Sequence, residues 1–242
     1  MLLRCIGAEL QKCRRAPVWL AFLALPLFPA ILGTGNYLAN LGALDNGWYS
    51  LWGQHTLFSS LFFLPALLGV FCAWQWRLES VGRNFNGFLC APAPIRDLFL
   101  AKLILAGAVC LMTQAWVGAL YLLSGRAVGL TQAPPPELPG WLLYGAAGAV
   151  TVCGAQLFFS LAVRAFAPPV AIALAGGILG LLATSQGLGY AFPYALLCLG
   201  MRANNPLMEL DALPFLLSAL AYTAFFSTLS IRLLRRRDAA TE

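Results

Sequence analysis

The stretch from Trp76 to Asp97, WRLESVGRNFNGFLCAPAPIRD, places charged residues at a spacing suited to binding a partner. Glu79 and Arg83 are four residues apart, which lets an acid and a base pair on one side of a helix. The APAP sequence then ends a helix, because proline cannot continue it. The helical apolar positions fall on the opposite side, at Trp74, Leu78, Val81, Phe85, Phe88 and Leu89. The pattern predicts a short amphipathic helix over residues 76–91, which either lies on a membrane or docks a partner.

Residue types that could support catalysis are sparse and scattered. His55 is the one histidine, and the seven cysteines include no CxxC pair, so we expect no metal site and reduced, buried cysteines. The sequence contains neither a Walker A glycine loop nor a GxSxG motif. We therefore expect a chain that is not an enzyme and that binds no cofactor itself.

The composition is that of a membrane protein. Of the 242 residues, 60% are hydrophobic and 10% charged, and the mean hydropathy is +0.78. Soluble domains carry about a quarter charged residues. The net charge of +6 lies at the ends of apolar runs and not on a soluble domain, so no nucleic-acid partner is expected. A membrane β-barrel would instead show short alternating segments.

The apolar runs predict an all-α multi-pass protein with six transmembrane helices. Of the 15 basic residues, only Arg126 and Arg202 fall on the side opposite the N-terminus. The positive-inside rule therefore places both termini in the cytoplasm. The chain forms a single transmembrane domain over residues 1–242. The spans are expected at Val18–Leu38, Thr56–Trp74, Leu98–Leu123, Trp141–Val163, Pro169–Gln186 and Leu213–Leu233.

Residues 1–17 predict an interfacial helix before the first span. Its apolar positions fall on one side at helical spacing, and Arg4, Gln11, Lys12 and Arg15 fall on the other. Such a helix lies on the inner leaflet with its apolar side in lipid. A basic N-terminus without fixed structure is the alternative.

The pattern resembles the permease subunit of ABC-2 type transporters, closest to the branch of lantibiotic-immunity and related peptide exporters. The order and spacing of four segments carry the resemblance over nearly the whole chain. These segments are AELQKCRRAPVW before the first span, WGQHTLFSSLFFLPALLGVFCAWQWRLE across the second, RNFNGFLCAPAPIRDLFLAKL into the third, and RANNP before the last.

The resemblance implies a role for the opening stretch. Residues 76–91 would be the cytoplasmic coupling helix, which seats on a separate ATP-binding subunit that holds ATP and Mg. The residues assigned to this coupling are Glu79, Arg83, Asn84, Phe85 and Asn86. Glu79 matches the usual acid of the family, whereas Phe85 stands where a tryptophan is common. A charge swap at Glu79 or Arg83 would then uncouple transport without unfolding the spans.

The resemblance also implies an outer re-entrant hairpin over residues 187–208, between the fifth and sixth spans. The function expected is that of a permease of an ATP-driven exporter in the bacterial plasma membrane, paired with a second copy or a sibling permease and surrounded by lipid. Its substrate would be amphipathic or hydrophobic, and an antimicrobial peptide exported for self-immunity is one candidate. The outer substrate path is assigned to Asn36, Asn40, Gln54 and His55.

Two other classes remain open from the sequence. A structural or sensory membrane protein would not need a helix that contacts an ATPase. An intramembrane enzyme would need an acid, base or nucleophile set within the spans. A lone ATP-binding subunit encoded beside this chain would argue against both.

Overall fold

Among the residues that the structure describes, six helical segments are long and apolar enough to cross a bilayer, which confirms the predicted multi-pass fold. The computed structural model describes residues 1–80, 92–163 and 165–239, and these ranges contain no strand. Its elements are α1 (Leu2–Cys13), α2 (Val18–Ala24), α3 (Leu27–Ala39), α4 (Gly47–Phe58), the π-helical turn η1 (Ser59–Phe63), α5 (Leu64–Ser80), α7 (Ile95–Ala127), α8 (Leu138–Val163), α9 (Ala167–Ser185), the 3-10 turn η3 (Gly189–Ala191), α10 (Ala195–Gly200) and α11 (Ala212–Ala239).

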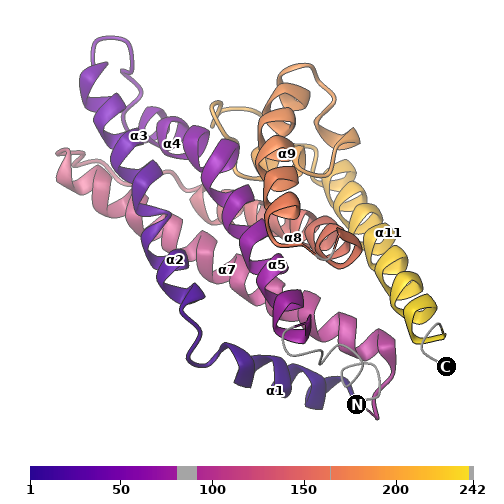
Figure 1. The fold of residues 1–242 in the computed structure, drawn as a ribbon. Coiled ribbons are helices and arrows are strands. Elements are labelled where there is room, and N and C mark those ends of the chain that lie inside the picture. The colour runs from indigo at the N-terminus through magenta and orange to yellow at the C-terminus, as the bar shows by residue number, and fades with distance from the viewer. Residues whose placement is uncertain (81–91, 164, 240–242) are drawn as a thin grey trace.

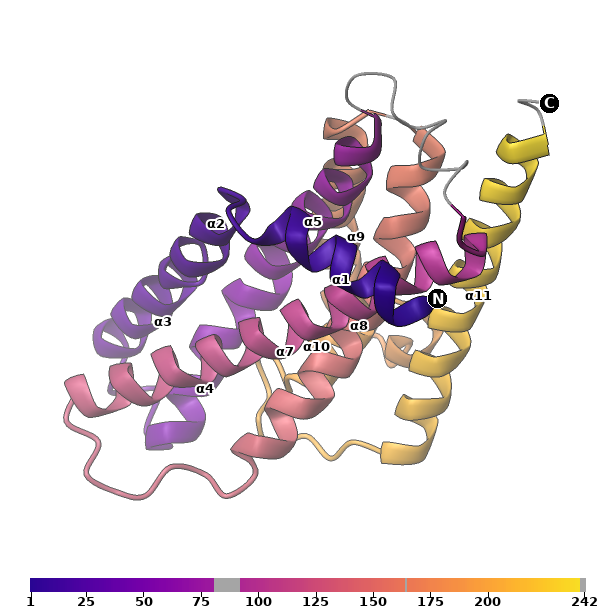
Figure 2. The same ribbon diagram turned by 90° about the horizontal axis from the view of Figure 1, so that it is seen from below.

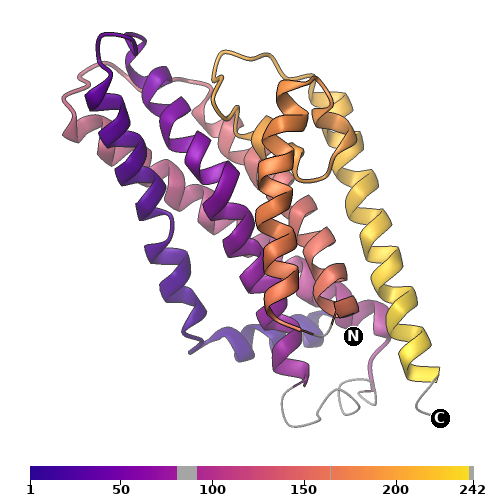
Figure 3. The same ribbon diagram turned by 45° about the horizontal axis from the view of Figure 1, so that its top comes forward.

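The N-terminus and the C-terminal end of α11 lie at the same end of the bundle (Figure 1). The connections from α3 to α4, from α7 to α8 and from α9 to α11 lie at the opposite end, as Figure 3 also shows. We call the end with the termini the inner end, following the predicted topology, and the other the outer end. Seen from below, α1 lies across α7 at the inner end (Figure 2).

The first two spans differ from the sequence prediction. The first is divided into α2 and α3 at Pro26, because proline removes a helical hydrogen bond and clashes with the preceding turn. The second runs over Gly47–Ser80 and so begins nine residues before the expected Thr56. Trp48 and Trp52 explain the early start, because both are buried and pack edge-on against Tyr121 of α7.

The segment between α9 and α11 turns back into the bundle as α10. Every residue of α10 is buried, and the helix packs mainly on α8 and α9. Gly148 of α8 makes this approach close, because a Cβ there would overlap the backbone carbonyl of Leu196. Gln156 and the hydroxyl of Tyr194 form a 2.6 Å hydrogen bond beside it. Small residues commonly let membrane helices pack this closely.

Replacing Gly148 with alanine should therefore destabilise the protein by about 1–3 kcal/mol, the usual range for overpacking a core. Gly154 on the same helix is the matched control, since a Cβ there would meet Thr223 only at 3.7 Å. Gly154→Ala should be neutral or stabilising, because alanine favours a helix over glycine by up to about 1 kcal/mol. Thermal unfolding in detergent measures both. Equal midpoints for the two variants would contradict the close packing of α10 on α8.

Candidate functional site

Four charged side chains from three helices meet at the inner end, and we call them the ion cluster: Glu9 and Lys12 of α1, Glu79 of α5 and Lys102 of α7. The ammonium of Lys102 lies 2.6 Å from an oxygen of Glu79 and 3.0 Å from an oxygen of Glu9. Lys12 donates to both carboxylates as well. Each carboxylate is therefore shared by two lysines, and the formal charges of the four side chains sum to zero.

Burying the four charged groups of the ion cluster costs desolvation free energy. Lys102 is fully buried, and Glu9 and Glu79 are also buried. The Lys102 ammonium lies 5.2 Å from the centre of the Trp76 ring, close enough for a cation–π contact. Removing ions from water is expensive, so they persist in such a place only when well paired. Ionisable groups at such positions in membrane proteins are commonly functional.

Lys12 stands at the water-facing edge of the ion cluster, with one third of its side chain exposed. Partial burial would by itself lower the pKa of Lys12. The hydrogen bonds to Glu79 and Glu9 outweigh that effect and raise the pKa above its ordinary value. Lys12 is therefore positively charged at neutral pH and joins α1 to α5 by an ion pair.

The ion cluster overlaps the predicted coupling segment over residues 76–91, because Glu79 belongs to both. Glu79 is in the last turn of α5, which ends at Ser80. The other coupling residues, Arg83, Asn84, Phe85 and Asn86, lie outside the described residues. Glu79 is buried and faces α1 and α7, and its coupling to an ATP-binding subunit stays a prediction.

Sequence reasoning missed three members of the ion cluster. The sequence pattern gives no reason to single out Glu9, and it marks Lys12 and Lys102 only as basic residues on the inner side. Lys102 carried a usable signal, because it is a lone lysine within the apolar stretch LFLAKLILA. A buried lysine in such a stretch requires a carboxylate partner.

Three of the four residues assigned to the outer path come together, from α3, its C-terminal cap and α4. The Asn36 amide donates to the Gln54 side chain at 2.5 Å, and Asn40 donates to Asn36 at 3.0 Å. His55 is buried instead, with its Nε2 2.9 Å from the hydroxyl of Thr34. Three of the four residues thus form one polar patch on the surface, whereas His55 lies inside the bundle.

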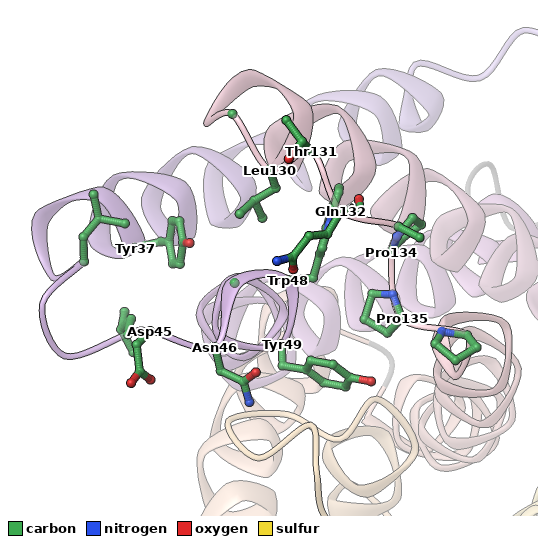
Figure 4. Close-up of a pocket in the computed structure, with 16 residues that line it drawn as sticks. Tyr37, Asp45, Asn46, Trp48, Tyr49, Leu130, Thr131, Gln132, Pro134 and Pro135 are labelled. Carbon is green, nitrogen blue, oxygen red and sulfur yellow. Dashed lines mark hydrogen bonds between the residues drawn. The ribbon is translucent and has the colours of Figure 1, made fainter.

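A hollow of about 750 Å³ lies at the outer end, between the α3–α4 connection and the chain from residue 129 to residue 136. Figure 4 shows Tyr37 and Asp45 on one side of it and Thr131, Gln132 and Pro134 on the other. The indole nitrogen of Trp48 donates to the carbonyl of Gln132 at 3.0 Å, which joins the two walls. The hollow is lined by aromatic and amide groups that could bind a ligand.

No group of three or more metal-ligating side chains is found among the described residues. Cys72, Cys110 and Cys153 approach one another in the middle of the bundle, and the sulfurs of Cys110 and Cys153 are 3.6 Å apart. The six cysteines within the described ranges are all free and buried, as expected from the sequence.

Comparison with known families matches residues 5–180 to the ABC-2 family of transporter proteins. The match covers most of α1, the first four spans and most of the fifth, together with all four members of the ion cluster. The chain belongs to the ABC-2 transporter family. No curated protein and no solved structure matches the sequence.

Membership gives the chain its general role. An ABC-2 family protein with six apolar spans is a permease subunit in the plasma membrane, associated with an ATP-binding subunit. The ion cluster then lies at the end of the permease that carries the predicted coupling segment.

Proposed function

We propose that the chain is the permease subunit of an ATP-driven exporter for amphipathic or hydrophobic molecules, working as a pair with a second copy or a sibling permease. The observation that carries the proposal is the position of Glu79. It is the last acidic residue of α5 before residues 81–91, and it is tied by ion pairs to both α1 and α7. A force on the coupling segment would therefore act on three helices at once.

In this mechanism ATP binding closes the partner subunits and moves the segment over residues 76–91. The inner end of α5 follows directly, because residues 76–80 of the segment belong to that helix. Lys102 pulls α7 along, and Lys12 pulls α1. Buried ion pairs with several hydrogen bonds suit this role, since separating their partners is energetically costly. The ion cluster is a mechanical joint in this mechanism, and no proton transfer is needed.

The exposed side chains of α3 favour the proposal of an amphipathic substrate. Phe28, Leu32, Asn36 and Asn40 follow one another at intervals of four residues, and all four side chains are exposed. Residues four apart are neighbours on a helix surface, so these side chains form a continuous row. The row is apolar at its inner part and polar at its outer part, as a molecule moving from lipid to water requires. Self-immunity against an antimicrobial peptide would fit this substrate class.

The experiment is to co-express the chain with an ATP-binding subunit encoded beside it and to purify the complex in detergent. The partner should co-purify with the wild-type permease and with Arg235→Glu, an exposed charge reversal on α11. Arg83→Glu should weaken the association at least tenfold, the order expected for a reversed charge at an interface. Equal recovery with all three permeases would contradict the coupling assignment.

Direction and substrate class are tested with the same complex in inside-out proteoliposomes. External ATP should drive a fluorescent amphipathic peptide into the lumen, and a catalytically inactive ATP-binding subunit should not. Loss of the probe from preloaded vesicles on addition of ATP would contradict export. Failure to move the peptide in either direction, with ATP hydrolysis intact, would contradict the substrate class.

A further inference from the structure

A small pocket of about 140 Å³ lies at the inner end, on the side of α5 away from α1. A water molecule takes up about 30 Å³ in the liquid, so the pocket suits a group of a few heavy atoms. It is lined by Ala73, Trp76, Arg77 and Ser80 of α5, Ser160 of α8, and Ala165 and Phe166 before α9.

The electrostatic character of the pocket is positive. Arg77 is exposed, and its guanidinium lies 5.8 Å from the centre of the Phe166 ring. Arg77 makes no ion pair within the described ranges, and the described residues that line the pocket include no acidic one. The pocket also adjoins the first residue of α9, and the N-terminus of a helix carries a partial positive charge.

Ser160 points to a ligand more directly. Its side chain is buried, with 4% of the residue exposed, yet its hydroxyl has no hydrogen-bond partner among the described residues. Serines within helices commonly donate to the carbonyl four residues earlier, as Ser80 does to Trp76 at 3.0 Å. Buried polar groups without a partner are rare, because each lost hydrogen bond is costly. A hydroxyl donor and an arginine in one pocket together select an oxyanion.

We propose that this pocket binds the phosphate group of an anionic phospholipid, held by the Arg77 guanidinium and the Ser160 hydroxyl. A guanidinium matches phosphate geometry through parallel N–H donors. The apolar surface beside the pocket favours a lipid over a free ion, since Val163 and Phe166 expose 42% and 37% of their area. Under the predicted topology the lipid belongs to the inner leaflet, and it joins α5 to α8 and to the start of α9.

The test is native mass spectrometry of the full chain in detergent, titrated with phosphatidylglycerol. Arg77→Gln should weaken binding roughly tenfold, because it removes a charge-assisted hydrogen bond. Ser160→Ala should weaken lipid binding by about threefold, because a neutral hydrogen-bond donor contributes roughly half the free energy of a charged one. Arg236→Gln, which removes an exposed inner-end charge from α11, should leave binding unchanged. Arg77→Lys should restore part of the affinity.

Ser160→Ala also separates binding from folding. It removes only an unpartnered hydroxyl, so in lipid-free detergent it should unfold at the wild-type temperature or slightly above. A clearly lower midpoint would show a structural role and overturn the proposal.

The oxyanion could come from a lipid headgroup or from free phosphate, and a titration with inorganic phosphate distinguishes the two. If phosphate raises the unfolding temperature of the wild type and not of the Arg77 and Ser160 variants, and no lipid is retained, the pocket takes free phosphate. That result would keep the phosphate chemistry and overturn the lipid assignment. Identical lipid binding by wild type, Arg77→Gln and Ser160→Ala would overturn the site.

Discussion

Replacing Lys102 with methionine should lower the free energy of unfolding by on the order of 3–5 kcal/mol, the range found when one partner of a buried ion pair is removed. Lys102 is fully buried and donates to Glu9 and to Glu79. Without it, two buried carboxylates would share the single ammonium of Lys12. Methionine fills a similar volume, so the loss would report on charge and not on a cavity. Thermal unfolding and the monodisperse fraction in detergent measure the effect.

A second substitution makes this prediction specific. Glu79→Gln in the Lys102→Met background leaves Glu9 paired with Lys12, so the formal charges of the cluster again sum to zero. The double variant should be more stable than Lys102→Met alone, although it departs further from the wild-type sequence. Such non-additivity is expected for residues in one network. A double variant that is less stable than Lys102→Met would show that Lys102 acts through packing and not through its charge.

The same geometry changes the expected result of Glu79→Lys. On sequence grounds a charge swap at Glu79 would uncouple transport and leave the spans folded. In the structure Glu79 is buried between Lys12 and Lys102, so a third lysine there would leave one carboxylate among three cations. We now expect Glu79→Lys to destabilise the permease itself. Arg83 is the better position for testing the partner interface.

The number of spans could be predicted because each is a long apolar run with basic residues at the inner end. The start of the second span could not, since GWYSLWGQ is no more apolar than a loop. The helix over this stretch is fixed by the tertiary contacts of Trp48 and Trp52, which are both buried. The indole nitrogen of Trp52 also donates a hydrogen bond to the carbonyl of Met201 at 2.8 Å. A hydropathy scale describes the free energy of transferring a side chain from water into an apolar phase, and it contains no information on such tertiary contacts.

The ion cluster was missed for a related reason. Periodicity showed that α1 has an apolar side, and the prediction placed that side in lipid. In the structure α1 meets a second surface, the bundle, and turns Cys5, Glu9 and Cys13 toward it, whereas Leu3 and Leu10 remain exposed. This orientation of α1 is favourable because it brings Glu9 to the buried ammonium of Lys102. A pattern within one helix cannot show which charges a neighbouring helix supplies.

Lys12→Met should reduce ATP-driven transport about 5–150-fold while the ATP-binding subunit still associates. This range corresponds to a coupling free energy of about 1–3 kcal/mol between two sites. Lys12 is the ion-pair partner that joins α1 to Glu79, and its partial exposure makes its loss less harmful to folding than that of Lys102. Peptide moved per ATP hydrolysed, in the proteoliposomes described above, is the measurement.

The matched control is Arg4→Met, which removes the same charge from the exposed side of α1. It should transport as the wild type does, because no cluster contact is lost. Lys12→Arg should restore most of the transport, since a guanidinium can bond to both carboxylates. If Lys12→Met instead lowered transport and ATP hydrolysis in equal proportion, the ion cluster would be stabilising the fold only. A lower ratio of transport to hydrolysis at an unchanged unfolding temperature would identify α1 as a moving part of the permease, because a purely structural ion pair has no means of altering that ratio.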